Sequence, residues 1–131
     1  MRPHRFAIAA LTTSAALAVS PVLAADVGAE ITTAAMHAGL AAQGSDIATV
    51  HTHLHHTVNC LVGPAGPGFD SKELNPCANA GNGAIPDSSD PRTKQALEAA
   101  LAKANSGLGA TDLAPARKDA SDTEAMLKSV K

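Results

Sequence analysis

Apolar residues recur every three or four positions in four separate stretches of the chain, and this is the period of an amphipathic α-helix. The stretches cover residues 26–43, 45–62, 90–105 and 111–130. The first carries its apolar stripe on Val27, Ile31, Ala34, Ala38 and Ala41 without an intervening proline. The pattern therefore predicts an all-α chain of about four helices.

Cap residues set the predicted ends of these helices. Gly44-Ser45 closes the first, and Ser45 can then cap the second, with Asp46 in its first turn. Asp90-Pro91 opens the third helix with a cap and a proline at the first helical position, where its missing N–H costs little. Asn105-Ser106-Gly107 is expected to stop that helix.

The second stretch allows two interpretations. Thr and Val alternate with His between Thr49 and Val58, which is compatible with a strand. The helical matches run longer, however, and they continue to Gly63-Pro64. They are Ile47, Val50, Leu54, Val58 and Leu61. We therefore expect a helix.

Residues 63–89 are rich in glycine and proline and form the predicted long loop between two helical hairpins. Short connections elsewhere favour a small antiparallel helical bundle. Within the loop, Asp70 to Glu73 has the form of a capping box, which predicts one short helical turn before Asn75-Pro76. A loop of this length in a compact domain is usually functional, disordered or held by a cross-link.

The N-terminus has the features of a secretory signal peptide. Arg2 and Arg5 precede an apolar run, residues 6–19, that is too short to span a bilayer. Small residues place cleavage after Ala24, or next best after Ala25. We expect residues 1–24 to be removed and residues 25–131 to form a single helical domain in the periplasm or outside the cell. The alternative is an uncleaved N-terminal anchor.

The composition argues against two classes of partner for this domain. The chain has a formal net charge of −2 at pH 7, and its lysines and arginines are scattered, which argues against nucleic acid or an anionic membrane as a partner. No apolar stretch after the signal is long enough to span a membrane. There is no Trp or Tyr and, after the signal, only Phe69, so we expect a thin core that needs a covalent or metal cross-link.

The two cysteines, Cys60 and Cys77, are predicted to form a disulfide, which an exported chain permits. Closing a loop of this size stabilises the fold by about 3 kcal/mol in the chain-entropy model. The alternative is a thiolate at Cys60 that binds a metal together with His53 and His56. If Cys60 is oxidised, this second set is lost and His53 and His56 are expected at the surface.

Four of the six histidines lie between His51 and His56 and supply the main chemical signal. His51 and His55 are four residues apart, a spacing at which two imidazoles on a helix can chelate one ion. If the chain folds back at Gly44, His37 lies opposite His51. The predicted metal site is therefore His37, His51 and His55, with His53 and His56 as secondary candidates, and with water, Asn59 or a carboxylate as fourth ligand.

These residues predict a protein that binds or buffers a divalent transition metal, since neutral nitrogens suit Cu(II), Zn(II) or Ni(II). The alternative is a structural or protein-interaction module with a disulfide and no metal. A third hypothesis is a pH-responsive binder, because histidine changes charge near pH ~6.5. The sequence contains no nucleophile motif, zinc-protease motif or phosphate loop, so we do not expect an enzyme.

Overall fold

The computed structural model describes residues 24–130, and its regular structure is entirely helical, as predicted. The helices of this part of the chain are α1 (Val27–Ala42), α2 (Ile47–Val62), α3 (Ala84–Asp87), α4 (Pro91–Gly109) and α5 (Leu113–Ser129). The predicted signal peptide, residues 1–24, lies outside the described residues except for Ala24.

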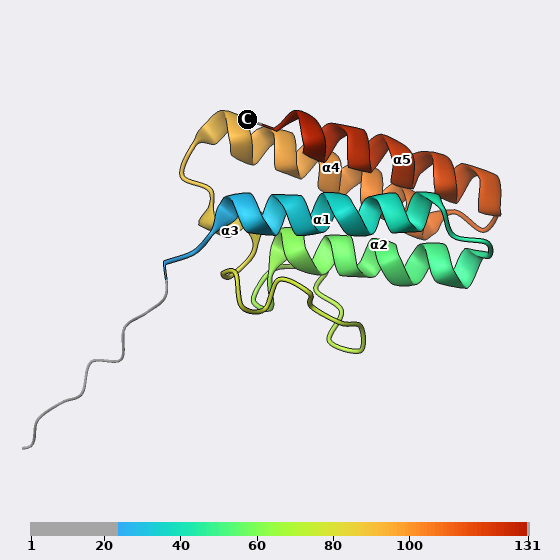
Figure 1. Ribbon diagram of the computed structural model, residues 1–131, viewed down its shortest axis with the longest axis horizontal. Helices are drawn as coiled ribbons and strands as arrows, with labels where there is room; N and C mark the ends of the chain where they lie inside the picture. The colour runs from blue at the N-terminus through green and yellow to red at the C-terminus, as the bar shows by residue number, and fades with distance from the viewer. Residues whose placement is uncertain (1–23, 131) are drawn as a thin grey trace, which may run out of the picture.

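The four long helices form an antiparallel bundle, in which each long helix runs in the opposite direction to the one before it in the chain (Figure 1). α1 packs against α2 and α5, and α4 packs against the same two helices from the other side. The short α3 lies near the start of α1 (Figure 1) and contacts α1, α2 and α4. The two hairpins, α1 with α2 and α4 with α5, are those that the sequence predicts.

Aspartates cap three of the long helices, and at the second an aspartate takes the place of the predicted serine. Asp26, Asp46 and Asp90 each accept a hydrogen bond from the backbone N–H three residues later, at 2.8–2.9 Å. The second helix therefore begins at Ile47, later than predicted, because the carboxylate of Asp46 caps it in place of Ser45. A carboxylate at this position also interacts favourably with the helix dipole.

α4 continues past the predicted stop at Asn105-Ser106-Gly107 and ends at Gly109. Gly107 lies inside the helix, at a point where α2 approaches closely. A Cβ added at Gly107 would come within 2.7 Å of Leu54 Cδ1. The glycine thus makes room for a large side chain of the neighbouring helix and does not terminate its own.

Alanine and a few larger aliphatic residues form the core. One buried cluster lies at the end of the bundle near the disulfide, and another lies toward the opposite end. In the second cluster, Val50, Leu54 and Val58 of α2 pack against Ala104 of α4 and against alanines of α5. Small side chains allow the helices to approach closely, so each larger residue contributes a substantial share of the buried area.

The long connection between α2 and α4 is held against the bundle at several points. The predicted Cys60–Cys77 disulfide is present. Asn59 binds the loop near Asp70, and Gly63, with a φ of +67°, directs the chain away from α2. The segment from Asp70 to Glu73 forms a single turn, in which the N–H of Glu73 donates to the carbonyl oxygen of Asp70 at 3.3 Å and the Asp70 carboxylate accepts from the N–H of Lys72 at 2.9 Å.

Among the described residues, no helix has both the length and the apolar character that a membrane crossing requires.

Candidate metal centre

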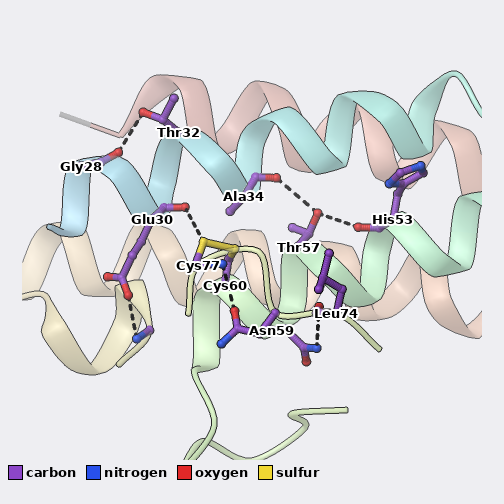
Figure 2. The surroundings of a disulfide bond; sticks show 12 residues. Gly28, Glu30, Thr32, Ala34, His53, Thr57, Asn59, Cys60, Leu74 and Cys77 are labelled. Atoms are coloured by element: carbon purple, nitrogen blue, oxygen red, sulfur yellow. Dashed lines mark hydrogen bonds between the residues drawn. A yellow bond between two sulfur atoms is a disulfide. The ribbon is translucent and has the colours of Figure 1, made fainter. Parts of the chain in front are cut away.

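Helix α2 is buried on two sides, and the side that faces α1 is polar. Thr57 Oγ1 lies 3.2 Å from the carbonyl oxygen of Ala34 on α1 and 3.1 Å from that of His53 one turn earlier (Figure 2). Cys60 follows on the same side and forms the disulfide with Cys77. Polar side chains therefore occupy the interface between the first two helices.

Three histidines converge in this interface: His37 of α1 with His53 and His56 of α2. Each offers one ring nitrogen, and these nitrogens lie within 4.8 Å of one another. Nδ1 of His37 is 3.3 Å from Nδ1 of His53. The three ring centroids are 5.0–5.5 Å apart. Within the described part of the chain, this is the group of three or more potential metal ligands that the fold assembles.

The spacing of these nitrogens suits a small divalent metal ion. Two imidazole nitrogens bound at ~2.0–2.1 Å to a tetrahedral metal lie about 3.3 Å apart. The separation between His37 and His53 has this value. The third nitrogen is at most 4.8 Å from the others, a gap that a modest rotation of one imidazole can close. The three histidines therefore fit a metal as ligands.

His56 has one ring nitrogen near an acceptor and the other without a partner. Nε2 lies 3.6 Å from Oε2 of Glu73, whereas Nδ1 is buried and has no hydrogen-bond partner among the described residues. An imidazole that directs its N–H toward a carboxylate leaves the other nitrogen with a free lone pair, the arrangement typical of metal-bound histidine. A buried polar atom without a partner otherwise costs free energy.

Burial favours the neutral form of two histidines of the cluster, His37 and His56. His37 is 9% exposed and His56 is 8% exposed. Removal from water, reinforced by the neighbouring imidazoles of His56 and His53, lowers the pKa of His37 to about 4. Burial and the nearby His53 also lower the pKa of His56, against the opposing effect of Glu73. Neutral imidazole is the form that binds metal, so these two ligands need not lose a proton at neutral pH.

The structure does not bring together the primary predicted set of His37, His51 and His55. His51 donates from Nε2 to the carbonyl oxygen of Ala110 at 3.0 Å, on the side of α2 away from the cluster. Nδ1 of His55 lies 3.6 Å from Asp70, and about a third of each of these side chains is exposed. Only His37 of the primary set belongs to the cluster, and its partners are the secondary candidates His53 and His56.

This difference has two causes. The connection between the helices extends to Asp46, so α2 begins only at Ile47 and a fold centred on Gly44 gives the wrong register. In addition, His53 and His56 lie outside the apolar stripe of α2, a position that favours exposure to solvent. Because α1 packs against that side, His56 is buried although Cys60 is oxidised, and the expectation of a surface position is wrong.

Asn59, considered as a fourth ligand, instead holds the loop. Its Nδ2 donates to the carbonyl oxygens of Asp70 at 2.9 Å and Leu74 at 3.1 Å, and its Oδ1 accepts from the N–H of Asp70 at 2.8 Å. These bonds place Glu73 beside His56. Glu73 belongs to no periodic pattern in the sequence. Only the length of the loop indicates a function for this segment.

The chain matches no protein-family model, and no curated protein or solved structure is significantly similar to it. Its function must therefore be inferred from the residues of the site.

Proposed function

We propose that this chain is an exported protein that binds one divalent transition metal through His37, His53 and His56. The supporting observation is the convergence of three imidazole nitrogens within 4.8 Å in a largely buried interface. The buried, unpartnered Nδ1 of His56 is the atom best placed to gain from a metal. Its other nitrogen faces Glu73, which would orient the ring.

The ligand set favours copper, zinc or nickel. Three neutral nitrogens suit Cu(II), Zn(II) and Ni(II), and the general order of affinities places Cu(II) highest. Water would complete the coordination, because the Glu73 carboxylate lies beside Nε2 of His56, across the ring from a metal bound at Nδ1. Because His37 and His56 are almost fully covered, little room remains for a substrate. We therefore propose metal binding or buffering, not catalysis.

Export is the second part of the proposal. Disulfides form and persist mainly in oxidising compartments such as the periplasm or the exterior of the cell, and Cys60 is bonded to Cys77. The basic start and apolar run of residues 1–24 are typical of a signal peptide. N-terminal sequencing of the exported form should read from Ala25. A product that still begins at Met1 would contradict this part.

Calorimetric titration tests the metal site. The protein, purified without a histidine tag or a nickel column, is titrated with Cu(II), Zn(II) and Ni(II). We expect a 1:1 complex with at least one of these metals. His53→Ala/His56→Ala should weaken binding at least 100-fold, because two of three ligands are lost. Circular dichroism of the metal-free variant checks that it is folded.

The chain supplies a matched control on the same helix. His51→Ala/His55→Ala removes the same number of imidazoles from α2 but none from the cluster, and should leave the affinity within about twofold of the parent. Equal losses in both double variants would show adventitious binding to a histidine-rich helix. A parent that binds none of the three metals below millimolar concentration would favour the alternative, a structural or interaction module with a disulfide.

A further inference from the structure

Glu30 of α1 has a fully buried carboxylate that is only half satisfied. The residue is 0% exposed. Its Oε1 accepts a hydrogen bond from the N–H of Gly83 at 2.8 Å (Figure 2), while Oε2 is buried without a partner among the described residues. A buried carboxylate normally has a cation or several donors around it.

A second carboxylate lies beside it. A Cβ added at Gly81 would be 2.3 Å from Oδ2 of Asp87 and 2.8 Å from Oε1 of Glu30, so the two acidic groups meet at this glycine. Asp87 accepts hydrogen bonds from the backbone and side chain of Asn82. The ion pairs found within residues 24–130 include neither Glu30 nor Asp87.

No basic side chain of residues 24–130 acts on this cluster. Burial raises the pKa of Glu30, the N–H of Gly83 opposes that effect, and Asp87 and Asp26 raise the pKa further. The two aspartates are thus the charged neighbours that act on Glu30, and both are acidic. A cation placed between these groups would be stabilised by all of them.

The start of the processed chain lies at the same point. The Cβ of Ala25 is 3.0 Å from the position that a Cβ on Gly81 would occupy. The backbone nitrogen of Ala25 is two bonds from the Cβ of the same residue, so it also lies close to Gly81. The next residue is fixed, because the N–H of Asp26 donates to the carbonyl oxygen of Ala80 at 2.7 Å. Ala25 is therefore held beside both carboxylates.

We propose that Glu30 and Asp87 form a binding site for the α-ammonium group that cleavage after Ala24 creates on Ala25. In that cleavage water hydrolyses the peptide bond between Ala24 and Ala25, leaving a carboxylate on Ala24 and a protonated amine on Ala25. A neutral peptide N–H is thereby replaced by a cation with three donors, which can turn about the Cα–C bond of Ala25 toward the unpartnered oxygen of Glu30.

Processing would then complete the fold at one end of the bundle. The ammonium group would join the first residue of the chain to α1 through Glu30 and to α3 through Asp87, next to the disulfide loop. This inference rests on the proposed cleavage site and is independent of the proposed metal site, which uses other residues at the interface of α1 and α2.

The pKa of the α-amine is the direct test. The exported protein is sequenced from its N-terminus and labelled uniformly with ¹³C, and the Cα and Cβ resonances of Ala25, whose α-amine stays unmodified, are followed by NMR as a function of pH. An ordinary α-amine titrates at ~7.7–8.0. With two carboxylates close by, we expect a pKa about one pH unit higher or more.

Three variants identify the groups responsible. Glu30→Gln keeps an acceptor oxygen for Gly83 and should return the pKa of the amine toward its ordinary range. Asp87→Asn should lower it as well, by a smaller amount. Asp112→Asn, a matched control, removes one exposed carboxylate that makes no capping hydrogen bond, and should leave the pKa of the amine unchanged.

Two results would overturn the inference. One is an α-amine at Ala25 that titrates at ~7.7–8.0 in the parent and at the same pH in Glu30→Gln. The other is an exported product whose first residue is not Ala25, which would also refute the proposed cleavage site. Neither result would affect the metal titration, so failure of this proposal can be distinguished from failure of the metal site.

Discussion

Of the two buried sides of α2, one is apolar and the other is polar. The side toward α4 and α5 carries Val50, Leu54 and Val58, packed against alanines of the neighbouring helices. The side toward α1 carries His53, His56 and Thr57, with Cys60 at its end. One helix therefore contributes both to the apolar core and to a polar interface with candidate ligands.

The comparison shows that burial serves different purposes on the two sides. On the apolar side it removes hydrocarbon from water and stabilises the fold in proportion to area. On the polar side it lowers the pKa of His37 and of His56 and leaves Nδ1 of His56 without a hydrogen-bond partner in the described chain. The first side thus stabilises the fold by burial of hydrocarbon, and the second holds the three histidines that we propose as metal ligands with α1.

The largest expected effect comes from the apolar side. Leu54→Ala removes one of the few large side chains of the core and leaves a cavity beside Gly107, so we expect the free energy of unfolding to fall by roughly 2–5 kcal/mol. Chemical denaturation measures this loss. Metal affinity, measured by titration under conditions where the variant is folded, should stay within about twofold of the parent.

If the free energy of metal binding fell in Leu54→Ala by as much as the free energy of unfolding, the two sides of α2 would be coupled. The apolar side would then not act on stability alone. Leu113→Ala, at the half-buried start of α5, provides a matched control for leucine truncation. It should cost less stability than Leu54→Ala because less area is buried there.

The second prediction concerns pH and the polar side. The folded pKa of His37 is about 4, below its ordinary 6.5, so the unfolded chain binds the proton first on acidification. The stability that neutral His37 contributes is present above pH 6.5 and is lost as the pH falls toward 4. Burial of His56 acts in the same direction. We expect a loss on the order of 2–3 kcal/mol from His37.

Chemical denaturation of metal-free protein at several pH values between 7 and 4 measures this effect. The parent is compared with His37→Gln, which keeps a polar side chain but does not titrate. The difference between the two isolates His37 from the carboxylates, whose own titrations are common to both proteins. Identical pH dependence in parent and variant would show that His37 is not held neutral by burial.

The sequence predicts the fold better than it predicts the site. Helical periodicity, the cap at Asp90 and the cysteine pair are local or nearly local signals, and they predict the all-α bundle and the disulfide. The apolar stripe of α2 also identifies the side that meets α4 and α5. These predictions succeed because apolar side chains at a fixed period have few alternatives to burial.

The site depends on information that no single helix contains. The sequence favours His51 and His55 over His53 and His56, because the first pair has the i, i+4 spacing and the disulfide is expected to leave the second pair at the surface. The packing of α1 against His53 and His56 reverses this order. The position of Glu73 follows from the hydrogen bonds of Asn59 with the loop. Neither arrangement is periodic, so neither appears in the pattern of the chain.

Two histidine–carboxylate pairs on neighbouring residues of α2 give the most discriminating prediction, although its effect is the smallest. His56 and Glu73 lie 3.6 Å apart at the buried cluster, and His55 and Asp70 lie at the same distance, more exposed and outside it. If Glu73 orients His56 for metal binding, Glu73→Gln should weaken the affinity by about 10- to 100-fold, or roughly 1.4–2.7 kcal/mol.

Asp70→Asn changes the matched pair and should leave metal affinity within about twofold. NMR of metal-free protein provides a second measurement, because long-range ¹H–¹⁵N couplings report which nitrogen of His56 carries the proton. We expect the proton on Nε2 in the parent, facing Glu73, and a mixture of tautomers in Glu73→Ala. If both carboxylate variants bound metal like the parent while His56→Ala did not, the imidazole of His56 would be oriented by packing alone. The histidines of α1 and α2 would then bind the metal without help from the loop, and the disulfide and Asn59 would have only a structural role.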